Sequence, residues 1–280
     1  MRLPFNFSFQ PSELVKFSVV LFLAKYFEKE NELDKSERTV LPCVGVFLGM
    51  VLLVLGQKDF STSVFIFIIG IIVFFVANAK LLWLIPFSFL AIPAGILAIA
   101  TQEYRLNRIR GFLHPEEGST TFNFQTIAAK NAISEGGIWG QGIGAGLSKL
   151  NKIPEVQADY IFAGWAEAMG FVGVIAYILL LSFFAWRGYR AALKSKSAFC
   201  SYACFGCVSS IVIQSLMNCM VVCGLLPSTG IPLPFFSVGG SSIIVTLAMC
   251  GFILNVSRGE GEQEKYIQTE DINIDTITVL

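Results

Sequence analysis

The sequence predicts an all-α fold: a polytopic helical membrane protein with about seven transmembrane helices and one large extracytoplasmic loop. Hydrophobic residues make up 54% of the 280 residues and charged residues only 14%, whereas a soluble domain usually carries about a quarter charged residues. Mean hydropathy is +0.67, and several apolar runs reach the roughly 18 residues that a membrane-spanning helix needs. The formal charge is balanced and no basic cluster stands out, so nucleic-acid binding is not expected.

Seven apolar runs predict the membrane helices. The first run is the weakest because Glu13, Lys16 and Lys25 interrupt it, and it could instead form a shorter, tilted or interfacial helix. A polar extracytoplasmic loop, residues 102–158, separates the fourth run from the fifth. The last residues, 259–280, are polar and acidic and are predicted to form a flexible cytoplasmic tail. In chain order, the predicted helices span residues 12–27, 40–57, 61–79, 81–101, 159–187, 198–223 and 235–256.

Positive charges in the short connections predict the orientation of the bundle. Cytoplasmic loops carry an excess of Lys and Arg, as do the connections after the first, third, fifth and last helices here. The charges concerned are Lys29, Lys35, Arg38, Lys80, Arg187, Arg190, Lys194, Lys196 and Arg258. Residues 57–59, 102–158 and 224–234 then lie outside. An odd number of spans would also place Met1 outside without a signal peptide, so we expect further helices upstream.

Two polar motifs stand at predicted outer helix ends. Glu13 and Lys16 are three residues apart, so they share a helix face and can form an ion pair. The alternative is an ordinary helix start that Ser12 caps. Asp59 lies directly before the third apolar run, where it could cap that helix. Ionisable groups at membrane depth are costly and usually serve a function, so both motifs are candidate site residues.

The long loop contains candidate phosphate-binding residues. Arg105, Arg108 and Lys149 are cations of the kind that suits phosphate oxygens, and the glycine-rich residues 140–144 can approach a ligand closely. The glycine pattern alone is weak evidence, since such loops often only turn. The single histidine, His114, has no sequence neighbour for metal or triad chemistry, and the lone CxxC lacks a second pair. The sequence therefore identifies no metal ligands.

Residues 224–242 read GLLPSTGIPLPFFSVGGSS, which is unusual beside apolar helices. Pro227, Pro232 and Pro234 forbid a continuous helix. Irregular backbone at a membrane face needs protein or water to satisfy its polar groups. The segment is therefore predicted to be a structured hairpin that lines a cavity.

This segment resembles the signature of the SEDS family (shape, elongation, division and sporulation proteins), which comprises FtsW, RodA and SpoVE. The usual signature is GLLP-x-TGIPLPF-x-S-x-GGSS, and every fixed position matches. Residues 10–16 (QPSELVK), residues 154–163 (PEVQADYIFA), Gln214 and Asn218 match the family as well. The resemblance covers residues 9–258, which we interpret as one SEDS-type membrane domain within residues 1–258.

Some positions indicate a subfamily and others depart from the family pattern. Residues 104–108, 124–125 and 140–149 are more similar to FtsW and SpoVE than to RodA. The family's usual Pro-Asp-Leu-Gly-Thr is Lys-Asp-Phe-Ser-Thr at residues 58–62, and its His-Thr-Asp is Gln-Ala-Asp at residues 157–159. The family's N-terminal helices before the QPSE motif are absent, so a fragment or a misplaced start codon is expected.

The resemblance implies a peptidoglycan glycosyltransferase of the bacterial inner membrane that polymerises lipid II, the undecaprenyl-pyrophosphate-linked disaccharide-peptide, for cell division or cell shape. The implied partner is a class B penicillin-binding protein, the transpeptidase, within the divisome or elongasome. A divalent cation, Mg or Mn, is the implied cofactor. Two alternatives stay open: a lipid II flippase, whose polar groups would follow a path through the membrane, and a non-catalytic scaffold of the division complex.

The resemblance places the family's essential carboxylate at Asp159, where the loop meets the fifth helix. As a general base, Asp159 would take the proton of the sugar 4-hydroxyl that attacks the anomeric carbon, which predicts inversion. From the residues alone, a helix N-cap is the alternative role. Cations would stabilise the leaving pyrophosphate. The candidate substrate-binding residues are Glu13, Lys16, Asp59, Arg105, Arg108, Lys149 and Glu155.

Overall fold

The computed structural model is a bundle of α-helices with a short β-hairpin at its N-terminus, and it confirms the predicted all-α class. It describes residues 2–3, 7–8, 10–33, 40–79, 95, 100, 102–113, 121–142 and 159–278. The strands β1 (Arg2–Leu3) and β2 (Phe7–Ser8) pair antiparallel. The helices are α1 (Pro11–Glu32), α2 (Leu41–Gly56), α3 (Phe60–Val76), α5 (Glu103–Leu113), α6 (Thr121–Gly136), α8 (Ile161–Lys194), α9 (Ala198–Val222) and α10 (Gly240–Thr278).

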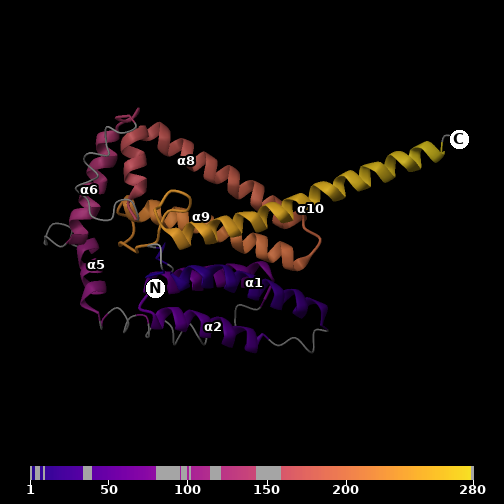
Figure 1. Ribbon diagram of the computed structural model, residues 1–280, viewed down its shortest axis with the longest axis horizontal. Helices are drawn as coiled ribbons and strands as arrows, with labels where there is room; N and C mark the ends of the chain where they lie inside the picture. The colour runs from indigo at the N-terminus through magenta and orange to yellow at the C-terminus, as the bar shows by residue number, and fades with distance from the viewer. Residues whose placement is uncertain are drawn as a thin grey trace.

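Helix α9 lies at the centre of the bundle, where α1, α3, α8 and α10 pack against it. Its side chains Ala203, Cys204 and Cys207 are fully buried, and such small residues let neighbouring helices approach closely. A Cβ on Gly206 would collide with Val20 of α1, at 2.6 Å. Figure 1 shows α1, α2, α9 and α10 running along the long axis, with α5 and α6 across one end. We call this end of the bundle the site end.

Several described helices suit a membrane. The helices α8, α9 and the first part of α10, Gly240–Gly259, are long and apolar enough to cross one, and α2 and α3 are apolar but shorter. The chain is therefore a multi-pass membrane protein. Helix α1 contains the whole predicted helix 12–27. It includes Glu13, Lys16 and Lys25, the charges that interrupt its apolar run. The predicted helix 81–101 lies outside the described residues, apart from residues 95 and 100.

Helix α8 corresponds to the predicted helix over 159–187 and extends it to Lys194, with a sharp kink at Gly170 that was not predicted. Gly170 has φ +63° and ψ −164° inside the helix. The turn at residues 137–142 binds the kink through its backbone: Phe171 N–H donates to the Gly137 carbonyl at 2.9 Å, and Gly142 N–H to that of Ala168 at 3.0 Å. These bonds satisfy backbone groups that the kink releases.

Two further segments differ from the predictions. The described part of the predicted polar loop 102–158 contains two helices, α5 and α6. Glu103 in the first turn of α5 and Arg110 in its last turn complement the helix dipole, which favours a helix despite the polar composition. Helix α10 continues to Thr278, where the sequence predicts a tail. The flexibility of that tail stays a prediction.

Candidate functional site

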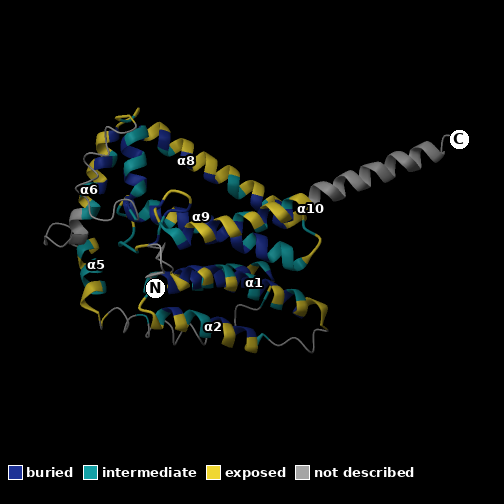
Figure 2. Cartoon of the chain, viewed as in Figure 1, coloured by how far each residue is buried: buried dark blue, intermediate teal, exposed yellow. Residues whose placement is uncertain are grey.

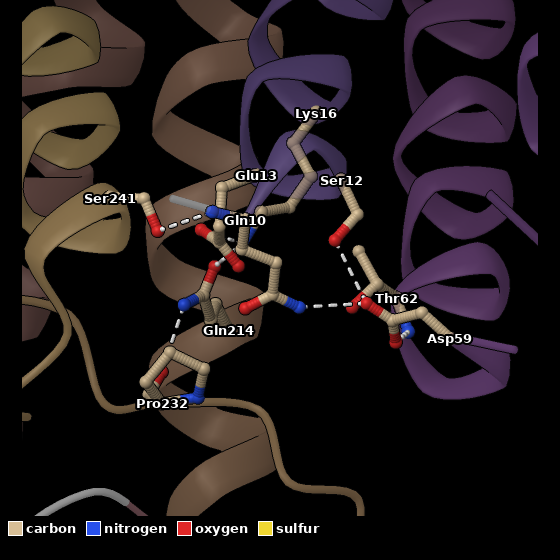
Figure 3. Close-up of polar contacts among 9 residues, drawn as sticks. All are labelled: Gln10, Ser12, Glu13, Lys16, Asp59, Thr62, Gln214, Pro232 and Ser241. Atoms are coloured by element: carbon tan, nitrogen blue, oxygen red, sulfur yellow. Dashed lines mark hydrogen bonds and ion pairs between the residues drawn. The ribbon is translucent and has the colours of Figure 1, made fainter. Parts of the chain in front are cut away.

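A buried ionic network begins at the start of α1 (Figure 3). Glu13 and Lys16 form the predicted ion pair, with 2.7 Å between Oε2 and Nζ. The two residues are only 3% and 4% exposed, and Lys16 Nζ also donates to Oε1 of Gln214 on α9 at 2.9 Å. Gln214 in turn donates to the carbonyl of Pro232 at 2.8 Å. Buried charges need such partners, and these join α1 and α9 to the irregular residues 223–239, the signature loop.

Asp59 caps α3, which confirms one of its predicted roles. Its Oδ1 accepts a hydrogen bond from the Thr62 N–H at 3.2 Å and so satisfies a donor that a helix N-terminus leaves open. Its Oδ2 accepts from the Ser12 hydroxyl at 2.8 Å and from the Gln10 carboxamide at 2.9 Å (Figure 3). Gln10, not Ser12, is the N-cap of α1, so the predicted Ser12 cap is wrong, and its hydroxyl joins α1 to α3 instead.

Asn218 lies one turn beyond Gln214 on α9 and holds two outer segments together. Its Nδ2 donates to the main-chain carbonyl of Asp159 at 2.8 Å and to that of Ile231 at 3.0 Å. The residue is 1% exposed. The irregular signature loop cannot satisfy its carbonyls by helical hydrogen bonds. The side chains of Gln214 and Asn218 on α9 donate to the carbonyls of Pro232 and Ile231 instead. This confirms the prediction of a structured segment that is not a helix.

The carboxylate of Asp159 and the guanidinium of Arg108 come together at Gly230 of the signature loop. A Cβ placed on Gly230 would lie 3.6 Å from Asp159 Oδ2 and 3.9 Å from Arg108 Nη1. Gly230 has φ +73°, a conformation that glycine adopts without steric cost. Helix α8 begins at Ile161 with Tyr160 in the N-cap position, so Asp159 precedes the cap rather than forming it.

Arg105 and Arg108 lie on one face of α5 and bind the backbone of two different loops. Arg105 Nη2 donates to the Lys58 carbonyl at 3.0 Å, and Arg108 Nη1 donates to the Ser228 carbonyl at 2.9 Å. Arg108 also packs over the ring of Tyr104, 4.3 Å from its centroid, and donates to its hydroxyl. Helix α5 therefore bridges the start of α3 and the signature loop. A guanidinium has five N–H donors in a fixed planar arrangement, so one arginine can contact several groups at once.

An open cavity of about 470 Å³ lies between these elements. Its charged lining consists of the cations Lys58, Arg105 and Arg108 and the carboxylate of Asp59. Positive charge therefore prevails, which suits a ligand with phosphate oxygens. Further polar lining comes from Gln10, Gln57, Ser61, Tyr104, Ser228 and Thr229.

The described site residues all lie at the site end, but they occupy different depths. Arg105, Arg108 and Asp59 line the cavity, and Asp159 lies beside its edge because Gly230 follows the lining residue Thr229. Glu13 and Lys16 are buried in the bundle, which differs from the expectation that they line the cavity. The predicted residues Lys149 and Glu155 lie outside the described residues.

The described residues do not form a metal site of their own. Among them, no three His, Cys, Asp or Glu side chains come close enough to hold an ion, and a divalent cation prefers several oxygen ligands. The described donor set therefore does not fit the implied Mg or Mn. The cation stays a prediction of the resemblance.

Sequence reasoning missed the positioning roles of Gln214, Asn218 and Gly230. The first two were noted only as family matches, although two amides four residues apart on an apolar helix share one face. That spacing was the available signal. Gly230 gave no signal of its own, because only the fold brings Asp159 and Arg108 to it.

Comparison with known proteins points to one family. Residues 1–262 match the family described as cell cycle protein, with FtsW, RodA and SpoVE as its members. Stage V sporulation protein E of Bacillus subtilis is 36% identical over 253 residues, which cover 90% of this chain and 69% of that protein. A probable peptidoglycan glycosyltransferase FtsW of Borreliella burgdorferi is 39% identical with the same coverage.

Solved structures share the fold. A chain of a peptidoglycan synthase complex, described as coordinating polymerization and crosslinking, matches with a TM-score of 0.68 and 27% identity over 92% of this chain and 72% of that chain. The rod shape determining protein RodA of Thermus thermophilus matches with a TM-score of 0.62 and 26% identity, covering 92% of this chain and 68% of that one.

Proposed function

Because this chain belongs to the FtsW, RodA and SpoVE family, we propose that it is a peptidoglycan glycosyltransferase that polymerises lipid II into glycan strands. Relatives named as probable peptidoglycan glycosyltransferases support the activity. The observation that carries the proposal is the approach of Asp159 and Arg108 to Gly230, beside a cavity with an excess of positive charge. A carboxylate beside cations is what sugar transfer from a lipid pyrophosphate needs.

In the proposed reaction, Asp159 accepts the proton of the 4-hydroxyl of one sugar. That oxygen attacks the anomeric carbon of the next sugar, and the bond to the lipid pyrophosphate breaks with its electrons on the leaving oxygen. Arg105 and Arg108 stabilise the charge that develops there, and Lys149 is a further candidate. A single base with in-line departure inverts the anomeric carbon.

The contacts around Asp159 support its role as the base. Asn218 donates to the main-chain carbonyl of Asp159, which fixes the position of this residue next to the signature loop. The buried network also holds the signature loop: Glu13 pairs with Lys16, Lys16 donates to Gln214, and Gln214 donates to the Pro232 carbonyl. We therefore assign Asp159 to chemistry and the buried network to positioning, with Arg105, Arg108 and Asp59 nearest to the substrate.

We further propose that the protein works in the bacterial inner membrane with a class B penicillin-binding protein, a transpeptidase, in the divisome or elongasome. The similarity to a chain of a complex that coordinates polymerization and crosslinking supports such a partner. Residues 104–108, which are more similar to FtsW and SpoVE than to RodA, favour a role in division.

The test is polymerisation of labelled lipid II in liposomes with the partner transpeptidase. Wild type, Asp159→Asn and Asp59→Asn are compared, each with any longer form that is encoded upstream. Asn at 159 keeps the main-chain carbonyl that Asn218 binds, so the fold should survive while the base is lost. We expect a loss of about 10²–10⁴-fold, as for removal of a general base, and a much smaller loss for Asp59→Asn.

Three results would contradict these assignments. Equal polymer from Asp159→Asn would remove Asp159 from the chemistry. Movement of lipid II across the bilayer without polymer would favour the flippase. If the intact complex with the transpeptidase neither polymerised lipid II nor moved it across the bilayer, the non-catalytic scaffold would be the remaining function.

A further inference from the structure

The turn at residues 137–142 exposes two large apolar side chains. Trp139 is 82% exposed and Ile138 is 64% exposed, although most tryptophans bury much of their surface. The turn joins the end of α6 and docks on α8, at a corner of the site end (Figure 1). An exposed apolar pair of this size indicates a contact with something other than water.

The exposure is built into the backbone. Phe171 N–H donates to the Gly137 carbonyl at 2.9 Å, and Val172 N–H donates to the Ile138 carbonyl at 3.2 Å. Gly140 lies against the backbone of α8 so closely that a Cβ there would collide with Ala168. These contacts fix the turn on the kink, and so they hold the side chains of Ile138 and Trp139 outward.

The exposed pair continues the lipid-facing side of α8. Beyond the kink, α8 is a membrane-spanning helix by length and composition, and Figure 2 shows exposed residues along its outward side. Exposed apolar residues recur at helical spacing on that side, at Phe171, Ile175, Leu179, Phe183 and Trp186. The turn bonds to α8 at Phe171 and Val172, so the exposed pair lies where this apolar side of α8 begins.

We propose that Ile138 and Trp139 insert into the boundary between headgroups and acyl chains of the bilayer at the site end. Tryptophan favours this boundary because its ring is apolar and its N–H polar. The membrane-spanning part of α8 then begins near Gly170, and residues 161–169 lie at or above the headgroups. The insertion would keep α6, and through it α5 with Arg105 and Arg108, at a constant height above the acyl chains.

The test uses tryptophan fluorescence of the full chain in vesicles of phosphatidylcholine and phosphatidylglycerol. Some vesicles carry lipids brominated near the headgroup and others lipids brominated near the chain end. The emission of Trp139 is the difference between wild type and Trp139→Phe, and the same difference for Trp186→Phe reports a residue on the lipid-facing side of α8. Because Trp139 is exposed, its replacement by Phe should leave the fold intact.

We expect shallow bromines to quench most of the Trp139 emission, deep bromines to quench less, and aqueous iodide to have little effect. Ile138→Trp in the Trp139→Phe background should behave in the same way. Quenching by iodide and not by bromines would place the turn in water and overturn the proposal. Insensitivity to both quenchers would mean that protein covers the turn, which would also overturn it.

Discussion

Asp59 and Asp159 both lie just before a helix at the same end of the bundle, yet their surroundings differ. Oδ1 of Asp59 caps α3, and its Oδ2 accepts from Gln10 and Ser12 and so connects α3 to the start of α1. Asp159 precedes the cap residue Tyr160 and is held through its main chain by Asn218. Its carboxylate lies beside Gly230 and Arg108.

Under the proposed function, the difference separates a structural aspartate from a catalytic one. The Asp59 carboxylate is held by three hydrogen bonds, from Thr62, Ser12 and Gln10, the last two of which connect α3 to the start of α1. Asp159 is instead positioned through its main chain by Asn218, and its carboxylate lies beside the Arg108 guanidinium at Gly230. The helix-start pattern is the same in the sequence, and only the partners separate the two roles.

The largest expected effect comes from serine at the two aspartates. Serine caps helices about as well as aspartate but cannot act as a base. Asp159→Ser should lower the polymerisation rate by about 10²–10⁴-fold, whereas Asp59→Ser should retain most of it. Rates from labelled lipid II, with melting temperatures in detergent, check the pair. If Asp59→Ser were inactive and Asp159→Ser active, Asp59 would be the catalytic carboxylate and Asp159 the structural one.

The second effect concerns the buried ion pair. Lys16→Met leaves the Glu13 charge buried without its cation, which should lower the free energy of unfolding by about 3–5 kcal/mol. The double variant Lys16→Met with Glu13→Leu should recover much of that loss, because no charge stays buried. The two variants are compared with wild type by thermal unfolding in detergent, with the accessibility of the buried cysteines as the measure of unfolding. Full stability of the single variant would argue that water or ions reach this network.

The third effect tests the main-chain support of Asp159. Asn218→Ala removes the donor to the carbonyls of Asp159 and Ile231, and unpaired buried carbonyls cost about 1–3 kcal/mol. We expect a lower melting temperature and a lower turnover at saturating lipid II, with little change in KM. Gln214→Ala is the comparison variant, because in the described part of the chain Gln214 bonds to Pro232 and Lys16 and not to Asp159. Equal turnover of the two variants would remove the special role of Asn218.

The smallest expected effect comes from alanine at two glycines with positive φ. It distinguishes the cost of backbone strain from the effect of a methyl group beside Asp159 and Arg108. Gly230→Ala and Gly137→Ala both place alanine at positive φ, +73° and +54°, at a cost of roughly 1–2 kcal/mol each. Only the methyl group at 230 would lie beside Asp159 and Arg108, because a Cβ on Gly137 meets nothing within 4 Å. Both variants should lose similar stability, but only Gly230→Ala should lose activity. Equal activity would show that substrate does not approach Gly230.

Much of the fold could be predicted because long apolar runs admit few structures in a membrane. The helices at residues 40–57, 61–79 and 198–223 agree with α2, α3 and α9 within a few residues. The kink at Gly170 could not be predicted, because the turn at residues 137–142 makes it possible from a distance. Helices α5 and α6 were missed because their composition is polar. Helix α6 packs against α8, and composition does not report such packing.

The sequence by itself determined the membrane class, the family, the Glu13–Lys16 pair and the capping role of Asp59. These follow from composition, from motifs or from spacing within one helix. Only the tertiary structure decided that Asp159, Arg108 and Gly230 meet, because they come from three segments far apart in the chain. It also decided that Lys16 finds Gln214 and that Asn218 finds Asp159. Buried polar groups must be paired, but which partner each one finds depends on how the helices pack.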